Sequence, residues 1–378
     1  EFICRHCGRS GKKDTDYSRC DRKFTRAGRF RELHSFPVLR CCHRNSGYCS
    51  NMASLASMSD SSQRVPSNRD LPPATVCAVI VTYFPDPGQL HELLESIAGQ
   101  VEATIIVDNT PSPGAPELEE MLAATLGPTS HTIRFGENRG IAAAQNTGIA
   151  RAIEQGFGYV ILLDHDSVLD AGMVERLRNT AEHLLTNGVA LAAVGPRNID
   201  LSSGRTARIQ RIGTLRVHHL SCADHLADAI VRCDVLISSG TLIPVSIIKA
   251  IGGLEEALFI DGVDHEWFLR ARGRGYSSYV ACKAILRHRL GTGAVRYWLG
   301  RWRYAPIHSP LRHYYILRNT LLLSRRSYVS FTWTAHQMVN TAAFLMVALV
   351  FLPGRTARFW LALRAIWHGV RNRGGPLI

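Results

Sequence analysis

Apolar runs of strand length alternate with segments of helical spacing from Val76 onward. The apolar runs are Val76–Thr82, Thr104–Val107, His131–Phe135 and Tyr159–Leu163. The segments of helical spacing between them are Leu90–Ile97, Glu117–Leu126 and Arg139–Gln155. This alternation predicts an α/β domain with a mostly parallel sheet, and continuously apolar runs are typical of strands covered by helices on both faces.

Polar side chains follow two of these runs directly. Asp108 and Asn109 come after the second run, and Asp164 and Asp166 come after the fourth. Ligands of parallel sheets gather beyond the carboxyl ends of the strands. The sequence therefore places four polar side chains on one rim of the sheet.

Asp164 and Asp166 are two residues apart, so in an extended segment their carboxylates face the same way. A divalent cation that bridges to a diphosphate would relieve their repulsion. The alternative is a polar strand end or a helix cap. Further upstream, Arg139 opens an Ala-rich segment that runs to Gly148, near which a phosphate or a carboxylate could bind. The alternative there is a helix N-cap followed by small packing residues.

Three acids precede an apolar cluster near residue 264. They predict the start of a helix whose apolar side is Trp267, Phe268 and Leu269. Acids at that end of a helix stabilise its dipole, which is the simpler interpretation. The functional interpretation makes Asp264 a general base. The acids are Asp261, Asp264 and Glu266. Taken alone, His288 is only a polar residue within an apolar run.

The order of these motifs resembles glycosyltransferase family 2, and most closely its bacterial rhamnosyltransferases. The matching segments read VIVTYFPD, IIVDN, ENRGIAAAQNTG, YVILLDHDS, FIDGVDHEWFLRARGRGY and RHRLG, and they extend from Val76 to Gly293. The resemblance implies a GT-A type, Rossmann-like mixed sheet in a transferase domain spanning 76–293.

The resemblance also implies roles for the donor-binding residues. The region of Thr82, Asp108 and Asn109 would hold the base and ribose of a nucleotide. Arg139 would lie near the pyrophosphate, and Asp164 would bind the nucleotide.

The same resemblance assigns the metal and the base. Asp164, Asp166 and His288 would bind Mg²⁺ or Mn²⁺, and Asp264 would be the catalytic base. Many relatives carry a carboxylate just before the base, but this chain has Val263 there, so Asp261 or Glu266 is the fallback. That list of roles describes an inverting transferase that uses a nucleotide-sugar, with dTDP-L-rhamnose as the expected donor. A transferase using a UDP-sugar, or an inactive nucleotide-sugar-binding protein, is the alternative.

The charge of the chain is divided unevenly. Residues 52–288 carry 19 Lys and Arg against 26 Asp and Glu, whereas residues 289–378 carry 13 Arg and no Lys, Asp or Glu. Arginines alternate with aromatics in residues 294–378, which predicts basic amphipathic helices on an anionic membrane surface. The densest apolar stretch there, Thr341–Leu352, has 12 residues, fewer than the roughly 20 of a spanning helix. A membrane span, a packing domain or an oligomer interface is the alternative. The acidic middle of the chain opposes nucleic-acid binding.

The first 51 residues differ from the rest. They hold six of the ten cysteines, begin with Glu-Phe and are followed by Met52, which is typical of a non-native or disordered leader. A zinc module is the alternative, and residues 52–75 form a linker. The other cysteines, Cys77, Cys222, Cys233 and Cys282, are expected as buried thiols. With no secretory signal seen, the sequence predicts a cytoplasmic protein on the inner face of the cell membrane, acting on a lipid-linked saccharide.

Overall fold

The computed structural model describes residues 72–112, 118–126, 129–201, 204–222, 229–288, 294–298, 300 and 302–377. The expectations for the leader 1–51, its zinc alternative and nearly all of the linker lie outside the described residues.

Four parallel strands form one half of the central sheet, as the sequence predicts. They are β1 (Val76–Thr82), β2 (Ala103–Pro111), β3 (Ser130–Gly136) and β4 (Tyr159–Asp164). The sheet continues in the order β3-β2-β1-β4-β10-β6-β11-β5, with β9 on β11.

The second half makes the sheet mixed. β10 is antiparallel between β4 and β6, and β11 is parallel to β6, while β5 and β9 are antiparallel to β11. The added strands are β5 (Ser167–Leu169), β6 (Leu191–Asp200), β9 (Ile230–Cys233), β10 (Thr241–Pro244) and β11 (Ser277–His288). The parallel-dominated mixed α/β fold that the resemblance implies is thus confirmed.

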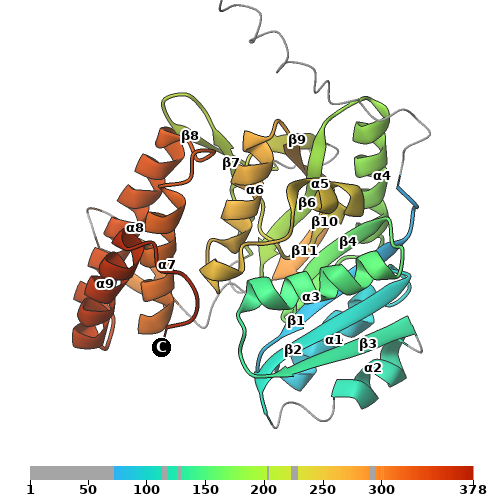
Figure 1. The fold of residues 1–378 in the computed structure, drawn as a ribbon, viewed down its shortest axis with the longest axis horizontal. Helices are drawn as coiled ribbons and strands as arrows, with labels where there is room; N and C mark the ends of the chain where they lie inside the picture. Colours follow the sequence, from blue (N-terminus) through green and yellow to red (C-terminus); the bar gives the residue numbers. More distant parts are fainter. Residues whose placement is uncertain are drawn as a thin grey trace, which may run out of the picture. The chain divides into compact units, whose positions relative to one another are not determined.

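Helices lie on both faces of the sheet (Figure 1). Alternate residues of the strands belong to two hydrophobic cores, one on each face. In β1, Val79 belongs to the first core and Ile80 to the second. Helices α3 (Ile141–Glu154) and α6 (Val263–Gly273) supply the first core, and α1 (Pro87–Ile97) and α4 (Met173–Thr186) supply the second. Gly148 lets α3 approach β1 closely, since a Cβ at this position would collide with Val79.

Smaller elements complete the sheet domain. They are α2 (Leu118–Leu126), α5 (Val245–Ile251), the 3-10 turn η3 (Glu256–Leu258) and the hairpin of β7 (Ile209–Ile212) and β8 (Val217–Leu220).

The C-terminal region begins with a hairpin and continues as helices. The hairpin pairs β12 (Ala294–Trp298) with β13 (Trp302–Pro306). The C-terminal helices are α7 (Pro310–Leu323), α8 (Phe331–Phe351) and α9 (Arg355–Val370). All of the apolar stretch Thr341–Leu352 except its last residue lies in α8, a helix of 21 residues. In the described part of the chain, α8 is long and apolar enough to cross a membrane by length and composition alone.

The expectation of four buried thiols holds for Cys77 and Cys233 but is wrong for Cys222 and Cys282, which form a disulfide. The two Cα atoms lie 5.6 Å apart across 60 residues of sequence. Cys282 lies in an irregular part of β11, between Ala281 and Ile285. Only the tertiary fold brings this cysteine close to Cys222. Free buried thiols favour a reducing compartment, whereas disulfides are rare there. Cys222 and Cys282 therefore do not support the expected reducing compartment.

Candidate active site

The carboxyl end of β4 brings together the two aspartates and the histidine named from the sequence. Asp164 ends β4, Asp166 follows in the turn, and β5 then pairs with the end of β11, where Ser167 lies opposite His288. One potential ligand atom from each of Asp164, Asp166 and His288 lies within 4.8 Å of the others. Two carboxylates and one imidazole suit Mg²⁺ or Mn²⁺, so these residues fit the expected divalent ion.

Buried hydroxyls support this cluster from behind. Nδ1 of His288 lies 3.1 Å from Oδ1 of Asp166, and 3.3 Å from the hydroxyl of Ser167. The Ser167 and Ser239 hydroxyls are 2.8 Å apart, and the backbone N–H of Asp164 donates to Ser239. Sequence reasoning missed Ser239, because Ser-Ser-Gly-Thr is an ordinary turn sequence until β10 pairs with β4.

The cluster is electrostatically coupled. Burial raises the pKa of Asp164, with a contribution from the charge of Asp166 that His288 partly offsets. Burial also acts to raise the pKa of Asp166, but the hydrogen bond and charge of His288 outweigh it and lower that pKa. Burial acts to lower the pKa of His288, and Asp166 and Asp164 more than reverse this. Crowded carboxylates attract a cation, and His288 must give up its proton to serve as a ligand of a bound metal ion.

The residues expected at the nucleotide lie on the same rim, at the neighbouring strand ends. Thr82 pairs in register with Asp108, and Val81 of the same strand pairs with Asp164. The Thr82 hydroxyl donates to Asp108 over 3.0 Å, and both side chains are buried. Asp108 also accepts the backbone N–H of Thr110. These contacts give Thr82 and Asp108 a definite structural role at the strand ends, whatever ligand binds there.

Asn109 connects β2 to the start of α3. Its side-chain oxygen accepts the backbone N–H of Arg139 over 2.8 Å, and its amide donates to Asn138 over 2.9 Å. The Arg139 guanidinium, in contrast, pairs with Glu137 at 2.9 Å and lies over the Phe135 ring. Contact with a pyrophosphate would require the guanidinium to leave these partners.

Asp264 lies in the first turn of α6, as the sequence predicts. Gly262 precedes the helix in the left-handed conformation, with φ of 78°. Oδ1 of Asp264 accepts the backbone N–H of His265 and lies 2.9 Å from its Nδ1. Burial acts to raise the pKa of Asp264, but His265 reverses this and holds the pKa below its usual value. The charge of Asp264 also raises the pKa of Asp164, so the two carboxyls are within electrostatic reach.

The two fallback carboxylates have other partners. Glu266 is fully buried, receives two hydrogen bonds from Arg270 at 2.8 and 2.9 Å, and accepts the Tyr328 hydroxyl. Asp261 accepts two hydrogen bonds from Arg312. At the start of α6 this leaves Asp264 as the carboxylate that is paired with a histidine rather than an arginine.

Helix α7 holds the segment that leads into Asp264, a feature that sequence reasoning missed. The Asn319 amide donates to the carbonyl oxygens of Leu258, Ile260 and Asp261 at 2.7–2.9 Å. Arg318, fully buried, donates to Leu258 and to Gly375. The residues of α7 resemble any helix surface in the sequence, because their backbone partners lie about 60 residues away along the chain.

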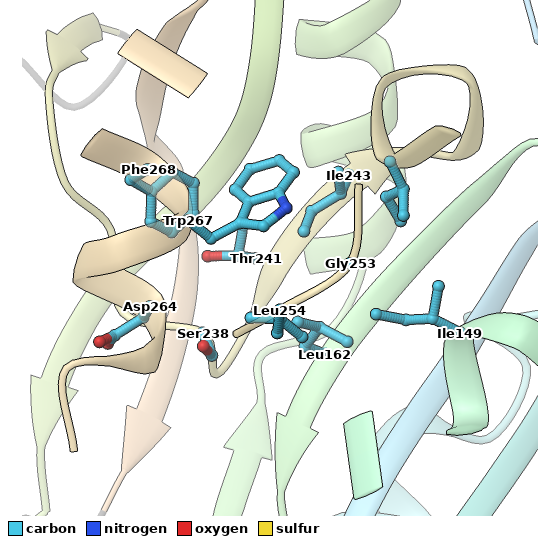
Figure 2. Close-up of a pocket in the computed structure, with 11 residues that line it drawn as sticks. Ile149, Leu162, Ser238, Thr241, Ile243, Gly253, Leu254, Asp264, Trp267 and Phe268 are labelled. Atoms are coloured by element: carbon cyan, nitrogen blue, oxygen red, sulfur yellow. The ribbon is translucent and has the colours of Figure 1, made fainter. Parts of the chain in front are cut away.

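An apolar crevice lies beside Asp264 (Figure 2). Its walls include Leu162 of β4, Ile149 of α3 and Trp267 of α6. In Figure 2 the carboxylate of Asp264 points away from these apolar side chains. The crevice therefore places apolar packing on one side of Asp264.

This chain is similar to known proteins to different degrees. Residues 77–237 match the family model described as glycosyl transferase family 2. Over 268 residues the chain is 31% identical to dTDP-rhamnosyl transferase RfbF of Shigella flexneri, covering 70% of this chain and 85% of that protein.

Solved structures are more distant. A structure of GalNAc-T7 with UDP, GalNAc and Mn²⁺ is 12% identical, with a TM-score of 0.47, over 73% of this chain and 56% of that one. TarS residues 1–349 of S. aureus give 14% identity and a TM-score of 0.44, over 78% and 81% of the two chains. The family match and the 31% identical relative are the stronger evidence, and by them this chain is a glycosyltransferase that belongs to glycosyltransferase family 2 and is similar to its rhamnosyltransferases.

Proposed function

We propose that this enzyme transfers L-rhamnose from dTDP-L-rhamnose, with inversion, to a lipid-linked glycan used in cell-surface polysaccharide synthesis such as O-antigen. The observation that supports the reaction is that Asp164, Asp166 and His288 lie together on one rim of the sheet. Asp264 is close enough for its charge to raise the pKa of Asp164. The donor identity is supported by the 31% identical relative, a dTDP-rhamnosyl transferase.

Asp264 is the base of the proposed reaction. Its carboxylate is ionised at neutral pH because His265 lowers its pKa. It takes the proton of an acceptor hydroxyl while that oxygen bonds to the anomeric carbon, and the bond from that carbon to the diphosphate oxygen breaks. A single displacement from the opposite face inverts the anomeric centre. The carboxylate of such a base contributes roughly 10²–10⁴-fold to the rate.

Asp164, Asp166 and His288 would hold the divalent cation. A bound Mg²⁺ or Mn²⁺ supplies positive charge for the departing diphosphate. The protein itself positions this charge, because Ser167 and Ser239 fix the imidazole and the backbone of Asp164.

The C-terminal region supports the proposed acceptor and the proposed location. Residues 289–378 carry 13 arginines and no acid, which suits an anionic leaflet at the inner face of the cell membrane. A membrane-bound enzyme meets a lipid-linked saccharide in two dimensions, and a homo-oligomer is compatible with this arrangement.

The test is nucleotide release with a membrane extract as the source of acceptor. We expect metal-dependent dTDP release from dTDP-L-rhamnose, lost on chelation and restored by Mg²⁺ or Mn²⁺. Asp264→Asn should lower kcat by roughly 10²–10⁴-fold, about 3–5 kcal/mol of barrier. Glu154→Gln, which alters an exposed ion pair with Arg151, is the matched control and should leave kcat unchanged.

The outcomes separate the alternatives. Release from UDP-sugars alone would replace the rhamnosyl donor but keep the reaction. Donor binding without release, in an extract that supports a related transferase, would favour an inactive binding protein. NMR of the product shows whether the anomeric centre is inverted.

A further inference from the structure

Helix α9 presents its apolar side to solvent. Its buried side consists of Arg358, Ala362, Ala365 and Gly369. Gly369 lies so close to α7 that a Cβ would collide with Leu321, so this is the side that packs inward. The opposite side carries six apolar residues that are each 43–68% exposed: Phe359, Trp360, Leu363, Ile366, Trp367 and Val370. Their spacing of three and four residues makes one continuous face.

Helix α8 repeats this arrangement. It packs inward through Trp333, Thr341 and Ala348, and the Thr341 hydroxyl lies 3.3 Å from that of Thr320 in α7. Its exposed residues include Val339 and Met346, at 68% and 61% exposure. In an ordinary helix of a water-soluble domain the exposed face is polar.

An apolar tip continues this surface on the sheet domain. Leu215, in the turn between β7 and β8, is 93% exposed, and Phe331, the first residue of α8, is 86% exposed. The two lie next to each other in the fold, since the Thr332 hydroxyl donates to the carbonyl oxygen of Thr214. Figure 1 shows this hairpin beside one end of α8.

The charge around these residues identifies the occupant. The segment 201–222, which contains the hairpin, carries four arginines and no acid, like the C-terminal region. Arg371 stacks over Trp367 with 3.6 Å from its Cζ to the ring centre, so cationic and aromatic groups are adjacent. A second copy would bring another acid-free face against this one, and like charges would repel. An anionic bilayer complements both the charge and the apolar side chains.

We propose that Leu215, Phe331 and the exposed faces of α8 and α9 together form one membrane-docking surface, which seats the enzyme on a bilayer that contains anionic lipid. The tryptophans lie at the level of the headgroups, where their amphipathic rings are stable. The proposal deepens the proposed function and rests on it for the lipid-linked acceptor. It adds the β7–β8 hairpin of the sheet domain to the C-terminal helices as a second point of membrane attachment.

The experiment measures co-sedimentation of the full chain with vesicles of phosphatidylcholine, with or without about 30% phosphatidylglycerol. We expect binding to the anionic vesicles that weakens as salt rises. Replacing Trp360 and Trp367 by Ser should weaken it about tenfold or more, and Leu215→Ser with Phe331→Ser about threefold or more. Ile230→Ser, at a 41% exposed apolar position of β9, is the matched control and should bind like the wild type.

Three results would overturn the proposal. The first is unchanged binding by both double variants. The second is binding that resists alkaline carbonate extraction and is independent of anionic lipid, which would make α8 a membrane span. The third is loss of self-association, measured by light scattering, in variants whose vesicle binding is unchanged, which would make the surface an interface between copies.

A separate assay distinguishes this proposal from the proposed function. Both double variants should keep wild-type dTDP release with detergent-solubilised acceptor. If wild-type protein binds anionic vesicles but releases no nucleotide from any donor, the docking surface stands and the proposed reaction fails.

Discussion

Arginines have different partners in the sheet domain and in the C-terminal helices. In the sheet domain Arg270 donates to the buried carboxylate of Glu266, and Arg272 lies 3.1 Å from Asp234. In the C-terminal helices Arg318 donates to the carbonyl oxygens of Leu258 and Gly375. Arg358 likewise donates to carbonyl oxygens of residues 308 and 353 and contacts the ring of His313. The sheet domain thus pairs half-buried arginines with buried carboxylates, whereas the C-terminal helices hydrogen-bond buried arginines to neutral groups.

The histidines show the same difference. Burial acts to lower the pKa of His265, but Asp264 and Asp261 raise it above its usual value. Burial and, second to it, the charge of the neighbouring Arg358 lower the pKa of His313 to about 4. A histidine in the acid-free region therefore stays neutral where one beside an aspartate becomes charged.

The difference shows how the C-terminal helices keep their positive charge. Carbonyl oxygens satisfy guanidinium groups without adding negative charge, so the region as a whole stays cationic. Where its arginines do meet acids, the partners belong to the sheet domain: Arg312 pairs with Asp261, and Arg326 with Glu255. One side of the helices is thereby attached to the segment before Asp264, while α8 and α9 expose apolar faces.

Replacing Arg270, which is paired with a buried carboxylate, should have the largest effect on the free energy of unfolding. Arg270→Met should lower the free energy of unfolding by about 3–5 kcal/mol, because it leaves the carboxylate of Glu266 buried without its cation. Urea titration measures this change. Adding Glu266→Gln should recover a large part of the loss, since no buried charge remains. A double variant as unstable as the single one would show that charge is not the reason.

The hydrogen-bonded arginine should matter less for stability and more for turnover. Arg318→Met leaves carbonyl oxygens rather than a charge unpaired, which should cost about 2–3 kcal/mol. Because the segment it holds leads to Asp264, kcat should fall about tenfold or more, with little change in the KM for the donor. Arg325→Met, just after the end of the same helix, is the control, since Arg325 donates to Val370 from an exposed position. An equal loss of kcat in both variants would contradict a positioning role for Arg318.

The sequence predicts the strand ends better than the supports behind them. β1 and the rim residues Asp108, Asp164 and Asp166 follow from local patterns, because an apolar run and the polar residue that ends it are adjacent in the chain. Ser239, Asn319 and the Cys222–Cys282 disulfide do not follow, because each depends on a partner 60 or more residues away. The apolar outward face of α9 has the spacing of any amphipathic helix, and only the packed structure shows that this side is not the buried one.

The contrast between the histidines predicts a pH dependence of stability. In the unfolded chain His313 titrates near its ordinary value, but in the folded chain its pKa is lowered to about 4. As the pH falls from about 6.5 to about 4, the unfolded state binds the proton first, so the folded state loses stability, by about 2–3 kcal/mol. Urea titrations of the wild type and of His313→Gln across this range isolate the effect as a difference between the two. Two parallel curves would mean that His313 is equally easy to protonate in both states, which would remove the contrast with His265.

The smallest effect should come from an arginine that is neither buried nor alone. Arg151 lies 3.2 Å from Glu154 on α3, but their side chains are 48% and 64% exposed. Water solvates both groups when the pair is broken, so Arg151→Met should change the free energy of unfolding by only about 0.2–0.5 kcal/mol. Urea titration at low and high salt checks this, because screening should remove even that difference. If Arg151→Met cost as much as Arg318→Met, burial would not determine what an arginine contributes, and the distinction between neutralised and hydrogen-bonded cations would lose its physical basis.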